Sequence, residues 1–129
     1  MPFISIDVFA PVNHTLPQEA TKMIQDLAEQ ELKFIPANTL VQFRFASPDE
    51  QWFFGSDGVN PIPLDRNHEP CFHVHTFVID PHATGVNLGK FAFDTFDQFK
   101  MLLASTYPGS SLPDDFHNRN KVTIVEHAG

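Results

Sequence analysis

The chain has 129 residues, about the usual length of one domain, so we expect a single domain spanning 1–129. Hydrophobic residues make up 42% and charged residues 19%, proportions that exclude an intrinsically disordered chain. The net charge of −8 argues against nucleic acid and membrane surfaces as partners, because both are bound by basic faces. No apolar run is long enough to cross a bilayer. The single cysteine, Cys71, cannot form an internal disulfide, so the cytoplasm is the expected compartment.

The first third of the chain is predicted to form a β-α-β unit. Apolar and polar residues alternate over 3–9, which is typical of a strand with one buried face. Apolar residues then recur at helical spacing and predict an amphipathic helix over 16–33, with one polar residue, Glu31, on its apolar side. The segment 15–18 matches a capping box with proline in the first turn. A second alternating segment predicts a strand over 39–46.

A long connection separates this unit from a second one. The segment 47–70 is rich in proline and glycine, and a structureless loop of that length is unusual in a compact domain. We therefore expect it to carry function or a small hairpin. The clearest strand pattern follows over 71–79, then an amphipathic helix over 88–106 and a final strand over 121–126.

Together these elements predict an α+β fold made of two β-α-β units. The first unit spans about 2–46 and the second about 71–126. The simplest packing pairs the two strands of each unit in parallel and joins both pairs in one four-stranded sheet. Both helices then pack on one face of that sheet.

Pro2 stands directly after the initiator methionine, at the head of the first predicted strand. Proline there can simply begin an edge strand, where a missing N–H group costs nothing. If Met1 is removed, however, Pro2 becomes a secondary amine at the chain terminus. An α-amino group titrates at about pH 8 in water, and an apolar pocket favours its neutral form further. Such an amine is a usable general base at neutral pH.

Pro2 and the predicted order of elements resemble the tautomerase superfamily. That family includes 4-oxalocrotonate tautomerase, 5-carboxymethyl-2-hydroxymuconate isomerase, cis-3-chloroacrylic acid dehalogenase and macrophage migration inhibitory factor. Its members share a catalytic N-terminal proline, and the long members are two fused β-α-β units that assemble as trimers. Three short motifs add to the likeness. VQFRF at 41–45 is similar to a strand of the dehalogenase branch, and PDEQWFFGS at 48–56 and EPC at 69–71 resemble motifs of the cytokine-like branch.

The resemblance implies an isomerase that needs no cofactor and acts as a homotrimer. The amine of Pro2 would remove a proton next to a carbonyl group and return it elsewhere, which interconverts keto and enol forms. The substrate would be a small anionic molecule, a 2-oxo acid. This chemistry requires removal of Met1, because a retained Met1 would hold the nitrogen of Pro2 in an amide bond.

Four residues are candidates for binding the substrate. Arg44 or Lys33 would hold a carboxylate or the developing oxyanion. Ile79 falls where the cytokine-like branch has a pocket isoleucine, and His75 suits proton transfer if its face of the sheet lies near Pro2. Simpler explanations remain open: Lys33 as a cation at a helix C-terminus, Arg44 as a solvated strand residue and Ile79 as a core residue.

Two histidines, His73 and His75, lie two residues apart in a predicted strand and therefore share one face, about 7 Å apart. Such a pair can bind zinc or another transition metal. No third ligand follows at a recognised spacing, so we assign no metal site. We favour a hydrogen-bonding role at a subunit interface or a pocket wall.

Departures from the family leave rival interpretations open. An arginine that binds carboxylates in the 4-oxalocrotonate tautomerase branch would fall near Val41, and paired arginines of the dehalogenase branch would fall in 80–84, which contains none. The missing arginines favour a catalytically inactive binding or assembly protein on the same scaffold. A third possibility is a metal- or small-ligand-binding module that uses His73 and His75.

Overall fold

The structure, a computed structural model, describes residues 3–46, 52–54, 61–63, 70–108 and 120–126. Its elements are β1 (Phe3–Phe9), α1 (Leu16–Leu32), the short 3-10 helix η1 (Pro36–Asn38), β2 (Leu40–Ala46), β3 (Trp52–Phe54), β4 (Pro61–Pro63), β5 (Cys71–Val78), α2 (Leu88–Thr106) and β6 (Lys121–Glu126). The four long strands and the two α-helices follow the predicted order, with bounds that match the predicted ones within one residue, and three short elements for which no bounds were predicted, η1, β3 and β4, lie between them.

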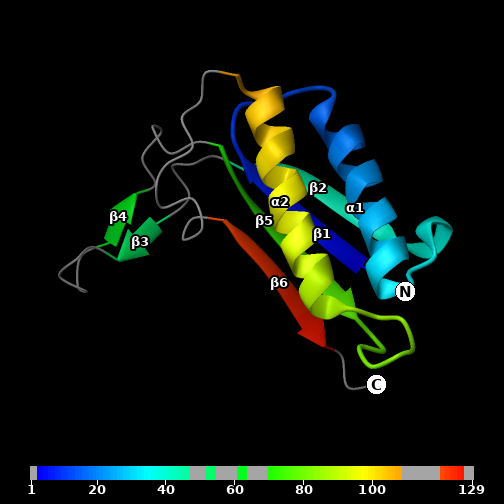
Figure 1. The fold of residues 1–129 in the computed structure, drawn as a ribbon. Coiled ribbons are helices and arrows are strands. Elements are labelled where there is room, and N and C mark those ends of the chain that lie inside the picture. Colours follow the sequence, from blue (N-terminus) through cyan, green and yellow to red (C-terminus); the bar gives the residue numbers. More distant parts are fainter. Residues whose placement is uncertain (1–2, 47–51, 55–60, 64–69, 109–119, 127–129) are drawn as a thin grey trace.

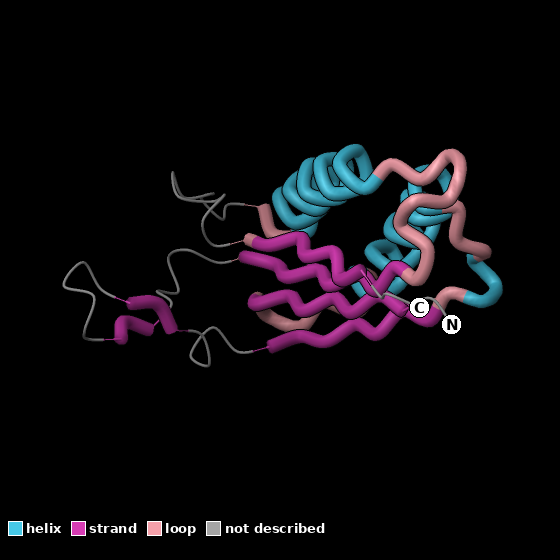
Figure 2. Tube along the Cα trace, turned by 90° about the horizontal axis from the view of Figure 1, so that it is seen from below, coloured by secondary structure: helices cyan, strands magenta, loops and turns pink. Residues whose placement is uncertain are grey.

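The main sheet has four strands in the order β2-β1-β5-β6. β1 pairs in parallel with β2, β5 pairs in parallel with β6, and β1 and β5 join the two pairs in antiparallel orientation. Both helices cover the same face of this sheet and run in opposite directions (Figures 1 and 2). The predicted α+β fold of two β-α-β units is thus confirmed. The small hairpin expected between the units is also present, as antiparallel β3 and β4.

The hydrophobic core lies between the sheet and the two helices. Alternation along each strand turns every second side chain inward, as the sequence pattern predicts. The inward residues of β1 and β5 are buried, and the rings of Phe72 and Phe99 stack at 5.1 Å between β5 and α2. The largest side chains that this layer buries completely are Phe72, Phe91, Phe99, Ile4, Ile6, Leu16, Ile24 and Leu103.

The start of α1 differs from the predicted capping box. Thr15 makes no capping hydrogen bond with its side chain. The side-chain oxygen of Asn13 instead accepts hydrogen bonds from the backbone N–H groups of Thr15 and Leu16, at 3.0 and 3.1 Å. It also accepts one from the Thr15 hydroxyl at 2.9 Å. The capping-box prediction was therefore wrong, because the amide two residues earlier satisfies the helix start and occupies the threonine hydroxyl.

The end of α1 is set by Lys33, which has a left-handed backbone conformation with φ 60° and ψ 29°. Its N–H group and that of Phe34 both bond to the carbonyl oxygen of Ala28, which satisfies the last turn. The chain then turns through η1 into β2. No helix in the described part of the chain is long and apolar enough to cross a membrane.

The outer face of the sheet, opposite the helices, is covered by no other element that the structure describes (Figure 2). Strand register arranges its side chains in rows that run across all four strands. We call them the apolar row (Leu40, Phe3, Phe77, Val125), the polar row (Gln42, Ser5, His75, Thr123) and the charged row (Arg44, Asp7, His73, Lys121).

Candidate functional site

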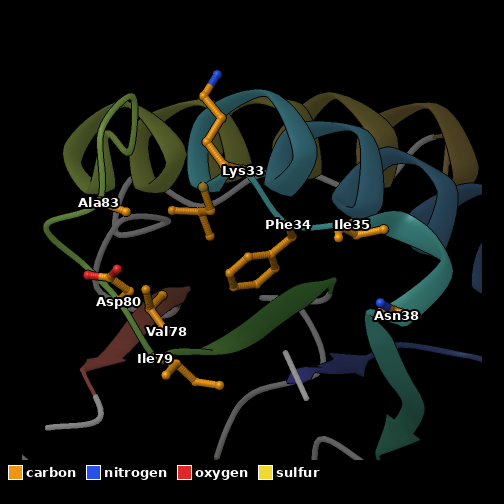
Figure 3. Close-up of a pocket in the computed structure, with 9 residues that line it drawn as sticks. Lys33, Phe34, Ile35, Asn38, Val78, Ile79, Asp80 and Ala83 are labelled. Atoms are coloured by element: carbon orange, nitrogen blue, oxygen red, sulfur yellow. The ribbon is translucent and has the colours of Figure 1, made fainter. Parts of the chain in front are cut away.

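A pocket of about 270 Å³ opens at the end of the sheet where β1 begins. Three segments that are distant in the sequence form its walls: the end of α1, the turn before β2 and the loop after β5 (Figure 3). Its lining residues are Leu32, Lys33, Phe34, Ile35, Asn38, Val78, Ile79, Asp80 and Ala83.

The start of β1 lies at the same end of the sheet as this pocket. Phe3 pairs with Leu40 at the beginning of β2 and with Phe77 near the end of β5. The neighbouring residues Asn38 and Val78 line the pocket. The candidate base, Pro2, lies outside the described residues. The first residue of β1 that the structure describes, Phe3, lies at the pocket end of the sheet.

The pocket walls are mainly apolar. Val78 is buried, and the ring of Phe34 points into the space between α1 and β5 (Figure 3). Ile35 and Ile79 are exposed to 60% and 52% and line the pocket. Ile79 lies one residue beyond β5, so it is a pocket residue and not part of the core. Asp80 adds a carboxylate at the same wall.

Lys33 belongs to the lining, but its ammonium group points away from the pocket (Figure 3). The Nζ atom donates a hydrogen bond of 2.9 Å to the carbonyl oxygen of Gln30. The aliphatic stem lies over Gly85, where an added Cβ would be 2.7 Å from Cε of Lys33. In this arrangement the lysine complements the last turn of α1, which is the simpler of the two roles predicted for it.

The loop between β5 and α2, which carries one wall of the pocket, is tied to α1 through Glu31. The carbonyl oxygen of Glu31 accepts a hydrogen bond of 2.7 Å from the N–H group of Asn87. Its carboxylate pairs with Lys90 at 3.0 Å, and Lys90 also pairs with Asp94 at 2.8 Å. Hydrogen bonds to Asp94 and Glu31 raise the pKa of Lys90 above its usual value. The polar residue in the apolar pattern of α1 thus has a structural explanation.

Arg44 and His75 lie on the outer face of the sheet and do not line the pocket. The Nε atom of Arg44 pairs with the carboxylate of Asp7 at 3.1 Å. Asp7 lies four residues beyond Phe3, or about 13 Å along the strand from the pocket end of the sheet. The structure therefore brings Lys33 and Ile79 together and places the other two substrate-binding candidates elsewhere.

His75 belongs to the polar row, between Ser5 of β1 and Thr123 of β6. Its ring lies 6.5 Å from that of His73, close to the spacing expected from strand geometry. Among the residues that the structure describes, no three histidine, cysteine or acidic side chains are grouped so that they could hold a metal ion.

Sequence reasoning missed several residues of the pocket, among them Phe34, Ile35, Asn38 and Ala83. They lie in turns that carry no recognised motif. What they share is their place in the chain. They lie just before β2 or just after β5, and both of these strand ends lie next to the start of β1. This place becomes a usable signal only when the strand order is known.

Comparisons with known proteins give a consistent result at the level of the fold. No protein-family model matches the chain, and no curated protein matches it. Solved structures do match over nearly its whole length. One is a macrophage migration inhibitory factor-like protein from Entamoeba histolytica, with a TM-score of 0.57 and 12% identity over 99% of this chain and 90% of the other.

Two further structures extend this likeness. Malonate semialdehyde decarboxylase FG41, inhibited by 3-bromopropiolate, has a TM-score of 0.58 and 13% identity over 98% of this chain and 83% of the other. A fused 4-OT in a symmetric trimer has a TM-score of 0.59 and 9% identity, over 97% and 85%. All three are tautomerase superfamily proteins. The chain has the tautomerase fold. The identities are low, so the likeness concerns the fold, and the chemistry of this chain has to be argued from its own pocket.

Proposed function

We propose that this protein is a tautomerase whose base is the amine of Pro2, freed by removal of Met1. The observation that carries the proposal is the position of the pocket. It lies at the end of the sheet where β1 begins, and Phe3 is held between the strands that lead into its walls. The proposal requires that the amine of Pro2, one residue before Phe3, meets a molecule bound in this pocket.

The apolar walls support a role in proton transfer. Phe34, Ile35, Val78 and Ile79 offer no partner to a positive charge, so burial beside them favours the neutral form of an amine, whereas the carboxylate of Asp80 would favour the charged form of an amine close to it. A neutral amine can remove a proton from the carbon next to a carbonyl group, and its conjugate acid can return the proton elsewhere. The reaction class is thus keto-enol tautomerisation of a small carbonyl compound, with no cofactor.

A 2-oxo acid is the substrate class that we propose, with Lys33 as the anchor for its carboxylate. The lysine lines the pocket and is held by one hydrogen bond to a backbone oxygen, so rotation of an exposed side chain brings it to a bound anion. Asn38 contributes an amide to the opposite wall. Arg44 and His75 reach a pocket only across a contact between copies of the chain.

We further propose that the protein is a homotrimer associated through the outer face of the sheet. Three residues of the apolar row, Leu40, Phe77 and Val125, are exposed to 53%, 38% and 39% in the single chain. A row of apolar side chains across a sheet is typical of a surface covered in an assembly. The fused 4-OT of the same fold is a symmetric trimer. The single cysteine keeps the cytoplasm as the compartment that we propose.

Intact-mass measurement is the first test of the catalytic proposal. A mass without Met1 supports it, and a mass that includes Met1 contradicts it. The second test is the rate of phenylpyruvate ketonisation, measured for the natural sequence and for Pro2→Ala. Loss of a general base should lower the rate by about 10²-fold or more. Phe93→Ala, a change at an exposed position of α2 that does not line the pocket, is the matched control and should leave the rate unchanged.

A non-catalytic assembly protein is the second candidate. It is favoured by the present position of the cations, since Arg44 is paired with Asp7 on the outer face and Lys33 is bonded to Gln30. Equal ketonisation rates for the natural sequence and Pro2→Ala, together with a stable trimer, would decide for this candidate. Light scattering gives the mass of the assembly, and Phe77→Asp should reduce it to that of the single chain, because a buried unpaired charge opposes association.

A further inference from the structure

Residues of α1 and α2 line a groove in the helical layer. The two helices lie on the opposite side of the sheet from its outer face (Figure 1). Two adjoining hollows of about 440 and 500 Å³ form it, and they share Met23 and Gln98. α1 contributes residues from Glu19 to Gln30, and α2 contributes residues from Asp97 to Leu102. We call this surface the helix groove.

The base of the helix groove is apolar and adaptable. Met23, Leu27 and Leu102 lie along it, and Met101 is exposed to 65%. Methionine has a flexible, polarizable side chain, and such side chains recur at surfaces that accept the apolar face of another helix. An exposed methionine above a line of apolar side chains is therefore better explained as a contact surface than as part of the core.

The edges of the helix groove are acidic. Three carboxylates line it, from Glu19 and Asp26 on α1 and from Asp97 on α2, against one cation, Lys22. In the part of the chain that the structure describes, none of these carboxylates takes part in an ion pair. Negative charge on both sides of an apolar floor is complementary to a ligand with an apolar stripe between positive side chains.

We propose that the helix groove binds a basic amphipathic helix of a partner protein. The lining residues of α1 recur every three or four positions from 19 to 30, which is about 16 Å or three helical turns. A helix of that length can lay an apolar stripe on the methionines while its lysines or arginines meet the carboxylates. The same groove of a second copy fits less well, because the acidic edges of the two grooves would repel each other.

This inference is independent of the proposed catalysis and assembly. The helix groove shares no residue with the pocket at the head of β1 or with the three rows of the outer sheet face. A trimer formed through the sheet would leave the helices on its outside.

A fluorescent 18-residue peptide of leucine and lysine, arranged with helical periodicity, is the probe that tests the proposal. Its binding to the purified protein is followed by fluorescence anisotropy, beside a scrambled peptide of the same composition. Asp97→Lys and Asp26→Lys should each weaken binding about tenfold, because each replaces an attraction by a repulsion at one edge of the groove. Glu126→Lys changes the net charge by the same amount at the exposed end of β6 and should have less than about a twofold effect.

Two results would overturn the proposal. The first is equal binding of the patterned and scrambled peptides, or equal losses for Asp97→Lys and Glu126→Lys, because attraction between net charges alone would then explain the binding. The second is a change in the mass of the assembly with Asp97→Lys, seen by light scattering, which would show that another copy of the chain occupies the groove. Unchanged circular dichroism confirms that each variant is folded.

Discussion

The two faces of the main sheet have different surroundings, although the same strands form both. Along β5, Phe72, Val74 and Thr76 turn inward and are fully buried beneath the helices, whereas Phe77 on the outer face is 38% exposed. Burial of the inner face supplies the free energy that holds the single chain together. The outer face carries rows of apolar, polar and charged side chains that no other described element covers.

The candidate pocket lies where both faces end. Val78 comes from the inner set of β5, and Ile79 continues the outer set beyond the strand. The pocket therefore combines a buried residue of the inner face, Val78, with an exposed residue of the outer face, Ile79. The contrast between the faces and the position of the pocket between them predict four effects of decreasing size.

The largest difference in the free energy of unfolding is expected between alanine variants of two phenylalanines of β5, one on each face of the sheet. Phe72→Ala removes a buried ring that stacks on Phe99 and should lower the free energy of unfolding by about 3–5 kcal/mol. Phe77→Ala on the outer face should cost less than about 1 kcal/mol in the single chain. Urea unfolding of both variants measures the difference. Equal losses of unfolding free energy would contradict the distinction between the two faces. A loss for Phe77→Ala that depends on protein concentration would show that the outer face is buried by association of copies.

Next in size is the effect of adding a methyl group to the loop at the pocket. Gly85 has a φ of +86°, where a side chain is strained, and the new Cβ would also displace the end of Lys33. Gly85→Ala should therefore lower the free energy of unfolding by about 1–2 kcal/mol. Gly89→Ala is the matched control. Its Cβ would meet nothing closer than 3.9 Å within the first turn of α2, and it should gain about 0.5 kcal/mol. An unchanged free energy of unfolding for Gly85→Ala would contradict this expectation and would show that the loop and Lys33 move to accommodate the methyl group.

Removal of a buried hydroxyl group on the inner face is expected to have a smaller effect of opposite sign, a gain in the free energy of unfolding. The Oγ1 atom of Thr76 is buried and has no hydrogen-bond partner among the residues that the structure describes. Thr76→Val keeps the shape and removes the unsatisfied group, so it should raise the free energy of unfolding by about 1 kcal/mol. Thr123→Val, on the outer face of β6, should change it by less than about 0.5 kcal/mol. Thermal melts of both variants provide the measurement, and a loss for Thr76→Val would reveal a partner for its hydroxyl.

The smallest effect is expected from the ion pair of the charged row. The Arg44 side chain is 65% exposed, so solvent screens its attraction to Asp7. A double-mutant cycle of Asp7→Asn and Arg44→Met should give a coupling below about 1 kcal/mol, falling further in high salt. A coupling energy above about 2 kcal/mol would contradict an exposed pair. It would indicate that the pair is buried in a contact between copies, so that the outer face, like the inner one, is covered.

The site was less predictable than the fold, as the candidate residues show. Pro2 was selected from its place directly after Met1 together with a family resemblance, and Ile79 from that resemblance alone. Nothing in the local sequence around Arg44 indicated that Asp7, 37 positions earlier, would bind it. Such a pairing depends on the register between two strands, and the register depends on the packing of the whole inner face.

Local sequence alone determined the elements of this protein and the faces of its strands. Alternation and helical periodicity are short-range consequences of one buried side, so they predicted every main strand and helix to within one residue. Tertiary structure alone decided which wall each turn supplies to the pocket and which carboxylate Arg44 meets. The Asn13 cap of α1, by contrast, is a local feature, because Asn13 lies two and three residues before the N–H groups that it bonds. For the pocket walls and for Arg44 the physical reason is the same: competing partners for a polar group or a turn lie close in space, and only the assembled sheet and helices select among them.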